Sequence, residues 1–278
     1  RKDLENLSIP FIGEIPQYLS AKKKLGFDKH TQSVMKAIVV KEGNRNIINE
    51  AFRVLRSNID FMAGKDSGQN VFMLTSFNPG SGKSFLAMNI AMSFAIKKKR
   101  ILVIDGDLRH GSTSSYVDSP KTGLSDYLGN RVSDWKEIIV KDEKYDNLHI
   151  IPIGTVPPNP TELLEDGKLA TLIEVLRSEY DYIFIDCPPI DIVADAQIIE
   201  KLADRTVFVV RSGLLDRSML PELENIYQEK RFKNLSVILN GTESAGGRYG
   251  YRYGYRNGYS SYYGNKGKMG GGKWMVIK

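Results

Sequence analysis

Residues 71–84 read VFMLTSFNPGSGKS and carry the strongest structural signal in this chain. An apolar, β-prone run at 71–75 enters a short loop of proline, glycine and serine. The triplet GKS at 82–84 then opens a segment, 85–98, whose apolar residues recur at helical spacing. A strand, a glycine-rich loop and a helix in this order predict a phosphate-binding P-loop, because consecutive backbone N–H groups and the positive end of the helix converge on an anion.

We expect this loop to bind the phosphates of a nucleotide. The Lys83 ammonium would reach the β- and γ-phosphates, and the Ser84 hydroxyl would ligate Mg²⁺. One position departs from the full pattern, because Phe77 stands where a glycine is usual. A glycine-rich turn without a ligand is the structural alternative. The nucleotide-binding residues predicted here are Gly80, Ser81, Gly82, Lys83, Ser84 and Phe85.

Length and composition indicate one large domain with appendages. The chain has 278 residues, 41% of them hydrophobic, which is enough for a sizeable core. Its single cysteine, Cys187, excludes an intramolecular disulfide and fits a reducing compartment. From Gly241 onward, seven basic residues stand against one acidic residue. This difference of six equals the net charge of +6 of the whole chain, so the body is neutral and we expect no nucleic acid as a partner.

The alternation of strands and helices predicts the fold class. Unbroken apolar runs indicate strands buried on both faces, as in a parallel sheet. Segments with helical spacing lie between or before them, including residues 44–62 and 161–179. We therefore expect an α/β fold with a doubly wound, mostly parallel sheet flanked by helices, as in P-loop NTPases. The expected strands are residues 71–75, 101–105, 148–153, 182–186, 206–210 and 235–239.

The chain divides into three regions by composition. Residues 1–43 contain short extended pieces broken by proline, and we expect them to form an N-terminal, juxtamembrane-like segment. Residues 44–241 hold the strands, the helices and the P-loop, and form the predicted catalytic domain. Residues 242–278 are expected to be a flexible tail.

Carboxylates end two of the expected strands. Asp105 and Asp107 close the run at 101–105, and Asp186 closes the run at 182–186. Ligands bind at the carboxyl ends of the strands in open α/β sheets, and an aspartate there holds Mg²⁺ in P-loop enzymes. A second carboxylate can accept the proton of an incoming hydroxyl group. The alternative is that aspartate simply initiates the turn after a strand.

The tail is a low-complexity tract of glycine, tyrosine, arginine and asparagine from Gly246 to Gly272. Such a tract lacks the aliphatic residues that a core needs. Seven of the fourteen tyrosines of the chain lie here. Three interpretations are open: binding of single-stranded nucleic acid, a linker, or a phosphorylation substrate. The seven tyrosines are Tyr249, Tyr251, Tyr253, Tyr255, Tyr259, Tyr262 and Tyr263.

Taken together, these motifs resemble the bacterial tyrosine kinases (BY-kinases), the cytoplasmic kinases of capsule and exopolysaccharide co-polymerase proteins. Residues 79–84 are similar to the Walker A motif of that family, 102–109 to its D-x-D-x-R motif, and 183–189 to its Walker B motif. The tyrosine-rich tail is similar to the autophosphorylation cluster of the family. The triplet Glu50, Arg53 and Arg56 matches the E-x-x-R-x-x-R helix motif that packs subunits of the family into a ring.

The resemblance implies ATP and Mg²⁺ as cofactors, and it implies roles for the residues at the phosphate edge. Asn240 resembles the strand-end asparagine with which related ATPases read adenine, and Arg211 would stack at the same place. Which aspartate is the general base stays open, with Asp105 favoured. The implied metal ligands are Ser84, Asp105, Asp107 and Asp186, and the implied catalytic residues are Lys83, Asp105, Asp107 and Asp186.

The resemblance also implies partners and a location. A homo-oligomeric ring would form through the helix at 44–62, and tail tyrosines would be phosphorylated between neighbouring subunits. A cognate tyrosine phosphatase and the polysaccharide export machinery would be further partners. A membrane segment upstream of Arg1 would place the domain at the cytoplasmic face of the bacterial inner membrane.

Two other kinds of function compete with a kinase. Cell-division and plasmid-partition ATPases share the motifs in part, but their P-loop reads K-G-G-x-G-K and their first lysine reaches across a dimer. This chain has Asn78 and then Pro79 at that place, together with a tyrosine tail that those ATPases usually lack. A nucleotide-gated scaffold without kinase activity is the second alternative.

Overall fold

The computed structural model describes residues 1–18, 37–64, 68–190 and 194–243. The tyrosine cluster at 249–263 and the flexibility predicted for the tail lie outside the described residues. Within them, no helix combines the length and the apolar composition needed to cross a membrane.

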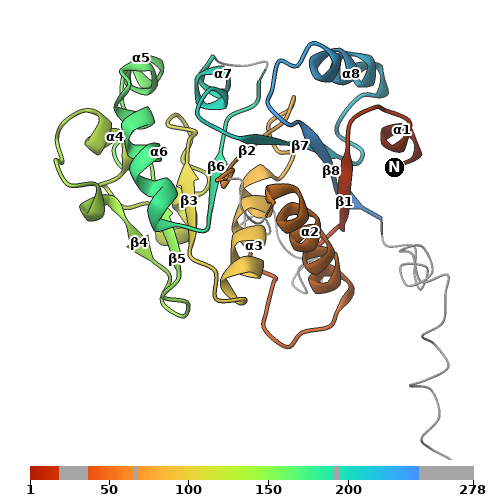
Figure 1. Ribbon diagram of the computed structural model, residues 1–278, viewed down its shortest axis with the longest axis horizontal. Coiled ribbons are helices and arrows are strands. Elements are labelled where there is room, and N and C mark those ends of the chain that lie inside the picture. The colour runs from red at the N-terminus through yellow and green to blue at the C-terminus, as the bar shows by residue number, and fades with distance from the viewer. Residues whose placement is uncertain (19–36, 65–67, 191–193, 244–278) are drawn as a thin grey trace, which may run out of the picture. The chain divides into compact units, whose positions relative to one another are not determined.

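The described residues form a sheet of eight strands in the order β1-β8-β7-β2-β6-β3-β5-β4 (Figure 1). All neighbouring strands run parallel except β4, which pairs antiparallel with β5 at one edge. The expected doubly wound, mostly parallel sheet is therefore confirmed. The strands are β1 (Phe11–Pro16), β2 (Val71–Thr75), β3 (Ile101–Asp105), β4 (Val140–Lys141), β5 (Leu148–Ile151), β6 (Tyr182–Asp186), β7 (Arg205–Arg211) and β8 (Ser236–Thr242).

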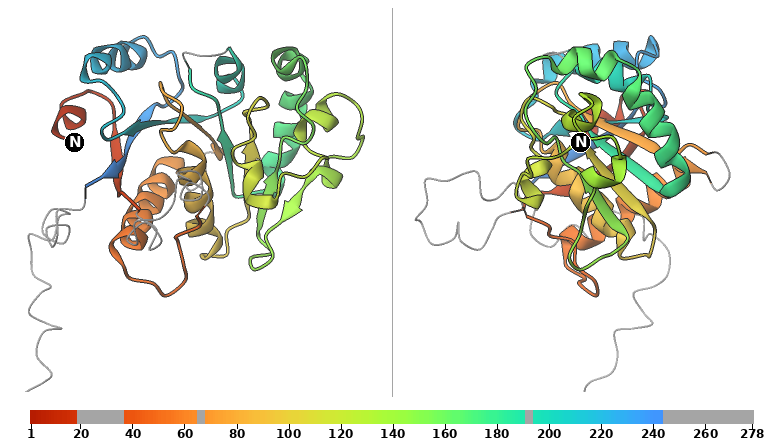
Figure 2. Two further views of the ribbon diagram at one scale, coloured as in Figure 1. Left: turned by 180° about the vertical axis from the view of Figure 1, so that it is seen from behind. Right: turned by 90° about the vertical axis from the view of Figure 1, so that its left-hand side faces the viewer.

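Helices cover both faces of the sheet. Figure 2 shows α2 and α3 together on one side, and α8 on the other. The α-helices are α1 (Lys2–Glu5), α2 (Ile47–Ala63), α3 (Lys83–Ala95), α4 (Leu124–Leu128), α5 (Pro160–Glu165), α6 (Lys168–Glu179), α7 (Asp195–Glu200) and α8 (Leu220–Gln228). Short 3₁₀ turns occur at η3 (Ser114–Val117), η4 (Trp135–Ile138) and η5 (Arg217–Met219).

The central strands are buried on both faces, as their unbroken apolar runs predict. Every residue of β2, β3 and β6 is buried. Phe72 of β2 packs against Phe184 of β6 with ring centroids 5.6 Å apart, and Phe94 of α3 packs against the same ring at 5.9 Å. This core fixes the position of α3 against the sheet, and with it the loop that opens α3.

Two features differ from the sequence-based expectation. The helix expected at 161–179 is two helices, α5 and α6, because the chain turns at Gly167, whose φ of 83° lies in the left-handed region. The N-terminal extended pieces form β1, which pairs parallel with β8 and so carries the sheet across the boundary predicted at residue 43. Pro16 is tolerated because it ends a strand at the edge of the sheet.

A buried asparagine fixes the segment that leads to α2. On α3, Asn89 is fully buried and makes four hydrogen bonds through its side-chain amide. Its Oδ1 accepts from the backbone N–H groups of Val39 (2.7 Å) and Val40 (3.2 Å). Its Nδ2 donates to the carbonyls of Ala37 (3.0 Å) and Phe85 (2.9 Å). This side chain therefore joins α3 to the segment before α2 and satisfies three of its backbone groups.

We expect Asn89→Ala to lower the free energy of unfolding by about 2–4 kcal/mol, because the Val39 and Val40 N–H groups lose their buried acceptor. Urea denaturation followed by circular dichroism measures the change. Asn225→Ala is the matched control, since Asn225 is exposed on α8 and its substitution should cost less than about 0.5 kcal/mol. Equal effects of the two substitutions would contradict the role assigned to Asn89.

Candidate nucleotide-binding and catalytic site

The loop between β2 and α3 needs glycine at two positions. Gly80 and Gly82 have φ values of 74° and 91°, in the left-handed region. At Gly82 a Cβ atom would also lie 2.3 Å from Nδ2 of Asn240. The helix α3 begins at Lys83, directly after Gly82, so its free N–H groups face the loop. The structure therefore has the strand, loop and helix of a P-loop.

The departure from the P-loop pattern at Phe77 has a packing reason. The Phe77 side chain is buried, and its ring meets that of Phe208 on β7 edge to face with centroids 4.8 Å apart. Phe77 is not among the residues with positive φ, so the backbone at this position does not require glycine. Phe77 therefore packs in the core and does not block the P-loop. Phe85 is similar, because its ring is buried against Phe52 and only its backbone N–H can serve a nucleotide.

The ends of β7 and β8 hold the P-loop from the side. Arg211 and Asn240 are register partners on these two strands. The Asn240 Nδ2 donates to the Ser81 carbonyl at 2.8 Å, and the Arg211 Nη1 donates to the Gly80 carbonyl at 2.8 Å. Both residues were expected at the base of the nucleotide. The structure brings them to the P-loop, and their contact with adenine stays a prediction.

Lys83 points back along the loop. Its Nζ lies 3.1 Å from Oγ of Ser76, within reach of the place where phosphates would bind. Burial lowers the pKa of Lys83, while the nearby carboxylates of Asp186 and Asp107 act to raise it. The ammonium group therefore sits beside an acidic cluster at the carboxyl edge of the sheet.

Two of the predicted aspartates are register partners at that edge. Asp105 ends β3 directly beside Asp186, which ends β6. The Asp105 Oδ2 accepts from the backbone N–H (2.6 Å) and the hydroxyl (2.7 Å) of Ser114. Hydroxyl groups of Ser84 (2.5 Å) and Thr113 (2.7 Å) donate to Oδ2 of Asp186. The Oδ1 atoms of both aspartates are buried without a hydrogen-bond partner.

Burial is also the main cause of the shifted pKa values of this pair. It raises the pKa of Asp105 to about 8, with a further contribution from Asp186, and it raises the pKa of Asp186 against the opposing effect of Lys83. Two adjacent buried carboxylates repel each other when both are ionised. A nearby cation would relieve both the desolvation and the repulsion.

These residues fit a magnesium ion. Two buried carboxylate oxygens without donors, next to the Ser84 hydroxyl, are hard oxygen ligands of the kind that Mg²⁺ prefers. Across the described ranges, no three side chains of His, Cys, Asp or Glu are grouped as a preformed metal cage. In proteins Mg²⁺ keeps several waters and is commonly completed by phosphate oxygens.

Asp107 and Arg109 of the D-x-D-x-R motif contact different parts of the chain. Asp107 caps the turn after β3, since its Oδ1 accepts from the backbone N–H groups of Arg109 (3.2 Å) and His110 (3.3 Å). Arg109 extends away from this turn. Its Nε and Nη2 atoms donate to the buried carboxylate of Asp195 at 3.1 and 3.4 Å, and Nη2 also donates to Thr161 Oγ1 at 3.0 Å.

The hydroxyl groups around the carboxylates were not anticipated from the sequence. Thr113 and Ser114 orient Asp186 and Asp105, and Ser76 contacts Lys83. Asp195, which anchors Arg109, was missed as well. Serine and threonine are common in loops, and no spacing rule distinguishes those that reach a strand end 73 residues away, as Thr113 does.

The helix motif on α2 has mixed contacts. Glu50 and Arg53 form an ion pair with each other on the surface. The Arg56 guanidinium instead contacts the neighbouring helix α3, where its Nη1 donates to the carbonyl (2.8 Å) and the hydroxyl (3.2 Å) of Ser93. The role of the three residues in oligomerisation stays a prediction.

Comparison with known proteins places the chain among P-loop proteins. Residues 69–215 match the family described as AAA domain. The chain is 32% identical over 210 residues to the putative tyrosine-protein kinase CapB of Staphylococcus aureus, a match that covers 75% of this chain and 91% of CapB. It is 34% identical over 210 residues to the tyrosine-protein kinase YwqD of Bacillus subtilis, covering 74% and 87%.

A putative tyrosine-protein kinase in the cps region of Klebsiella pneumoniae is longer. The match at 34% identity over 250 residues covers 87% of this chain but only 33% of the Klebsiella protein. The present chain therefore corresponds to about a third of that relative.

Solved structures agree with these relatives. The chimerical protein CapA2B2 superposes with a TM-score of 0.74 at 30% identity, covering 87% of this chain and 99% of the chimera. The kinase domain of the Escherichia coli tyrosine kinase ETK gives a TM-score of 0.74 at 28% identity, covering 87% and 94%. MinD in the MinC:MinD complex of Aquifex aeolicus shares the fold more distantly, with a TM-score of 0.52 at 24% identity over 63% and 69% of the two chains.

The buried carboxyl group of Asp105 makes a pH-dependent contribution to the free energy of unfolding. Because the pKa of Asp105 is raised in the folded protein, folding takes up a proton at pH values between about 4 and 8. The contribution of the Asp105 carboxyl group to the free energy of unfolding is thus fully present below pH ~4, where the group is protonated, and is lost as the pH rises through about 8. We expect Asp105→Asn to stabilise the nucleotide-free protein in EDTA by about 1–3 kcal/mol at pH 8, and by less at pH 5.

Urea unfolding at the two pH values measures this difference. Asp181→Asn is a control of opposite sign, because hydrogen bonds from Arg100 lower the pKa of Asp181 despite its partial burial. That substitution should destabilise the protein at pH 8. A destabilising effect of Asp105→Asn at pH 8 would show that burial of the ionised carboxylate carries no net cost to stability.

Proposed function

This chain belongs to the bacterial tyrosine-protein kinases, and we propose that it transfers the γ-phosphoryl group of ATP to tyrosines of its own C-terminal tail. The observation that supports this most is the pair of buried, unpartnered carboxylate oxygens of Asp105 and Asp186 beside the P-loop lysine. In the reaction, the phenolic oxygen forms a bond to the γ-phosphorus while the bond from that phosphorus to the β–γ bridging oxygen breaks. ADP leaves, and the phenolic proton passes to a carboxylate.

The P-loop would bind the triphosphate. Backbone N–H groups at residues 80–84 and the start of α3 would face the phosphates, and Lys83 would exchange its contact with Ser76 for the β- and γ-phosphates. Arg211 and Asn240 already hold two carbonyls of this loop, so the loop is preorganised for the anion. At the base, the same two side chains would contact adenine.

Ser84, Asp105, Asp107 and Asp186 would hold Mg²⁺. When bound, this ion supplies charge neutralisation on the transferring phosphoryl group, which passes through a loose transition state. The hydroxyl groups of Ser114 and Thr113 each donate to one oxygen of these carboxylates, and the Oδ1 atom of each, which has no hydrogen-bond partner, would be available to the metal.

A carboxylate base would accept the proton of the tyrosine. A tyrosine hydroxyl titrates near ~10 and is a poor nucleophile at neutral pH, so a positioned acceptor accelerates its attack. We favour Asp105, because its carboxylate ends β3 at the phosphate edge and its Oδ1 atom has no hydrogen-bond partner among the described residues.

The residue at position 78 favours a kinase over a partition-type ATPase. In those ATPases a lysine at this position acts across a dimer, whereas Asn78 has no ammonium group. Its backbone carbonyl accepts from the hydroxyls of Ser76 (2.8 Å) and Ser81 (2.7 Å) within the loop. The relatives with the higher identities are named tyrosine-protein kinases, whereas MinD is similar in fold only.

We further propose that the reaction occurs in trans within a ring formed through α2, and that residues 1–43, 44–241 and 242–278 act as N-terminal segment, kinase domain and substrate tail. The tail would be opposed by a cognate tyrosine phosphatase. The relatives from capsule regions suggest that the ring regulates polysaccharide export at the cytoplasmic face of the inner membrane, through a membrane segment upstream of Arg1.

Intact-mass spectrometry tests the kinase. Phosphatase-treated protein incubated with ATP and Mg²⁺ should gain a ladder of phosphate groups on the tail, and Lys83→Met should abolish the ladder because the triphosphate loses its lysine. Lys201→Met, an exposed lysine far from the loop in sequence, is the matched control and should leave the ladder intact. Steady ATP hydrolysis without added mass would instead support a partition-type ATPase, and nucleotide binding without either signal a scaffold.

Light scattering tests the ring. We expect the double substitution Arg53→Ala/Arg56→Ala to shift the protein from an oligomer to a monomer, and Arg45→Ala, an exposed arginine just before α2, to leave the oligomer unchanged. Because Arg56 also bonds Ser93 within the chain, thermal melting must accompany the measurement. An assembly that persists in a folded double variant would refute an interface through this motif.

A further inference from the structure

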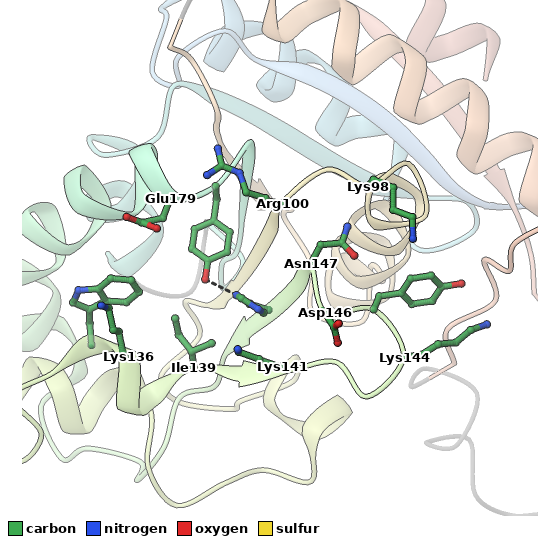
Figure 3. A pocket seen from close by; sticks show the side chains of 13 residues that line it. Lys98, Arg100, Lys136, Ile139, Lys141, Lys144, Asp146, Asn147 and Glu179 are labelled. Atoms are coloured by element: carbon green, nitrogen blue, oxygen red, sulfur yellow. Dashed lines mark hydrogen bonds between the residues drawn. The ribbon is translucent and has the colours of Figure 1, made fainter.

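A pocket opens at the end of the sheet where strands β3, β5 and β6 begin, which is opposite the end that carries the P-loop. It has a volume of about 790 Å³, within the range of ligand-binding pockets (Figure 3). Lys98 and Arg100 precede β3, Asp146 and Asn147 precede β5, and Glu179 lies just before β6. The pocket therefore lies at the amino ends of these strands, whereas Asp105 lies at the carboxyl end of β3. Because β3 has five residues, roughly 16 Å of strand separates the two sites.

The walls of this pocket are aromatic and neutral. Trp135, Tyr145 and Tyr180 line it, together with His149. The Tyr180 hydroxyl and the Nδ1 atom of His149 are 2.7 Å apart, which fixes both rings. Burial lowers the pKa of His149 and raises the pKa of Tyr180 to about 12, so neither is charged at neutral pH. A planar ring can therefore pack in the pocket without meeting a buried charge.

The rim of the pocket is basic. Arg100 is already paired with Asp181 at 3.0 Å. Of the ion pairs that the described residues form, none includes one of the four lysines at the rim. Two acidic residues, Asp146 and Glu179, also line the pocket, so four lysines minus two acids leave an excess of +2. The four lysines are Lys98, Lys136, Lys141 and Lys144.

Part of the rim is rigidly supported. The Asn147 side chain donates from Nδ2 to the carbonyls of Ala95 (2.9 Å) and Lys99 (2.6 Å), which ties the turn that carries Lys98 to the start of β5. The ammonium groups of Lys136 and Lys144 lie 5.7 Å and 5.1 Å from the ring centroids of Trp135 and Tyr145. The two ammonium groups therefore lie over the aromatic walls. A ligand that packs an aromatic ring against these walls and carries an anionic group could pair with them.

We propose that this basic pocket binds phosphotyrosine side chains of the C-terminal tail, supplied by the same or a neighbouring copy of the chain. The ligand joins a planar ring to a phosphate dianion, which matches aromatic walls under a lysine rim. The inference rests on the proposed function, because the kinase itself would generate the phosphotyrosines. Their tether to the domain would hold them at high effective concentration, which favours them over other ring-bearing polyanions such as single-stranded nucleic acid.

Charge makes the pocket selective for the phosphorylated form. Residues 244–278 contain seven basic residues and no Asp or Glu, so the unmodified tail is repelled by the lysine rim. Each phosphotyrosine adds about −1.5 to −2 charges, so about four phosphates neutralise the tail and further ones reverse its sign. The pocket would thus respond to the extent of phosphorylation, and we expect binding to rise steeply beyond about four phosphates.

Binding of synthetic peptides tests this proposal without using the kinase reaction. A labelled peptide of residues 246–263 is prepared with phosphotyrosine at all seven tyrosines and, separately, unmodified. Each is titrated with the phosphatase-treated full chain in the absence of nucleotide, by fluorescence anisotropy. We expect the phosphorylated peptide to bind, the unmodified peptide not to bind, and the affinity to fall as the salt concentration rises.

Substitutions locate the binding. Lys141→Ala/Lys144→Ala should weaken the phosphorylated peptide about tenfold, because two rim charges are lost. Lys2→Ala/Lys201→Ala is the matched control, with the same change of charge at exposed lysines that do not line the pocket, and it should bind as the unsubstituted chain does.

Three outcomes would overturn the proposal: equal affinity of the two double variants, equal binding of the two peptides, or rim-dependent binding of a deoxythymidine oligonucleotide with none of the phosphopeptide. The last would assign the pocket to nucleic acid. Because the peptides are synthetic, these outcomes leave the phosphate ladder of the intact protein untouched, so the pocket and the kinase fail independently.

Discussion

The juxtaposition of Asp105 and Asp186 is the constraint on which the site depends. Each ends a fully buried strand, and the sheet register places them side by side. Each has one oxygen satisfied by hydroxyl or backbone donors and one without a partner. A folded protein carries such a pair at a cost to its stability, because two desolvated carboxylates repel each other. The arrangement persists because the core of β2, β3 and β6 is extensive, and a divalent cation with phosphates would relieve it.

The last two long strands control the geometry of the loop. Arg211 ends β7, Asn240 lies near the end of β8, and their side chains donate hydrogen bonds to the carbonyls of Gly80 and Ser81. Asn240 also occupies the space beside Gly82 where a Cβ would stand. The same strand β8 ends at Thr242, the first residue of the predicted tail. Strand β8 therefore contacts the P-loop through Asn240 and also leads into the tail. A displacement of β8 would change the position of the P-loop.

The sheet separates two chemistries. Its carboxyl edge gathers the P-loop, three aspartates and their hydroxyl donors, an arrangement suited to phosphoryl transfer. Its amino edge carries the basic pocket, with aromatic walls beneath lysines. In our proposals the site at the carboxyl ends of the strands forms phosphotyrosine, and the basic pocket at their amino ends binds it. Because rigid strands join the two edges, occupancy of the pocket could only influence the loop through movement of whole strands or of α3, whose C-terminal turn borders the pocket.

Local patterns in the sequence determined the buried parallel strands, the position of the P-loop and the aspartates at the strand ends, because burial on both faces requires unbroken apolar runs and a tight anion-binding turn requires glycine. They did not reveal the break at Gly167 or the pairing of β1 with β8. Only the tertiary structure decided that Phe77 packs on Phe208, that Arg109 bonds Asp195, and that lysines from η4, from β4 and from two loops line one pocket. These contacts join residues far apart in the chain, and their geometry follows from the packing of whole elements, which no local spacing encodes.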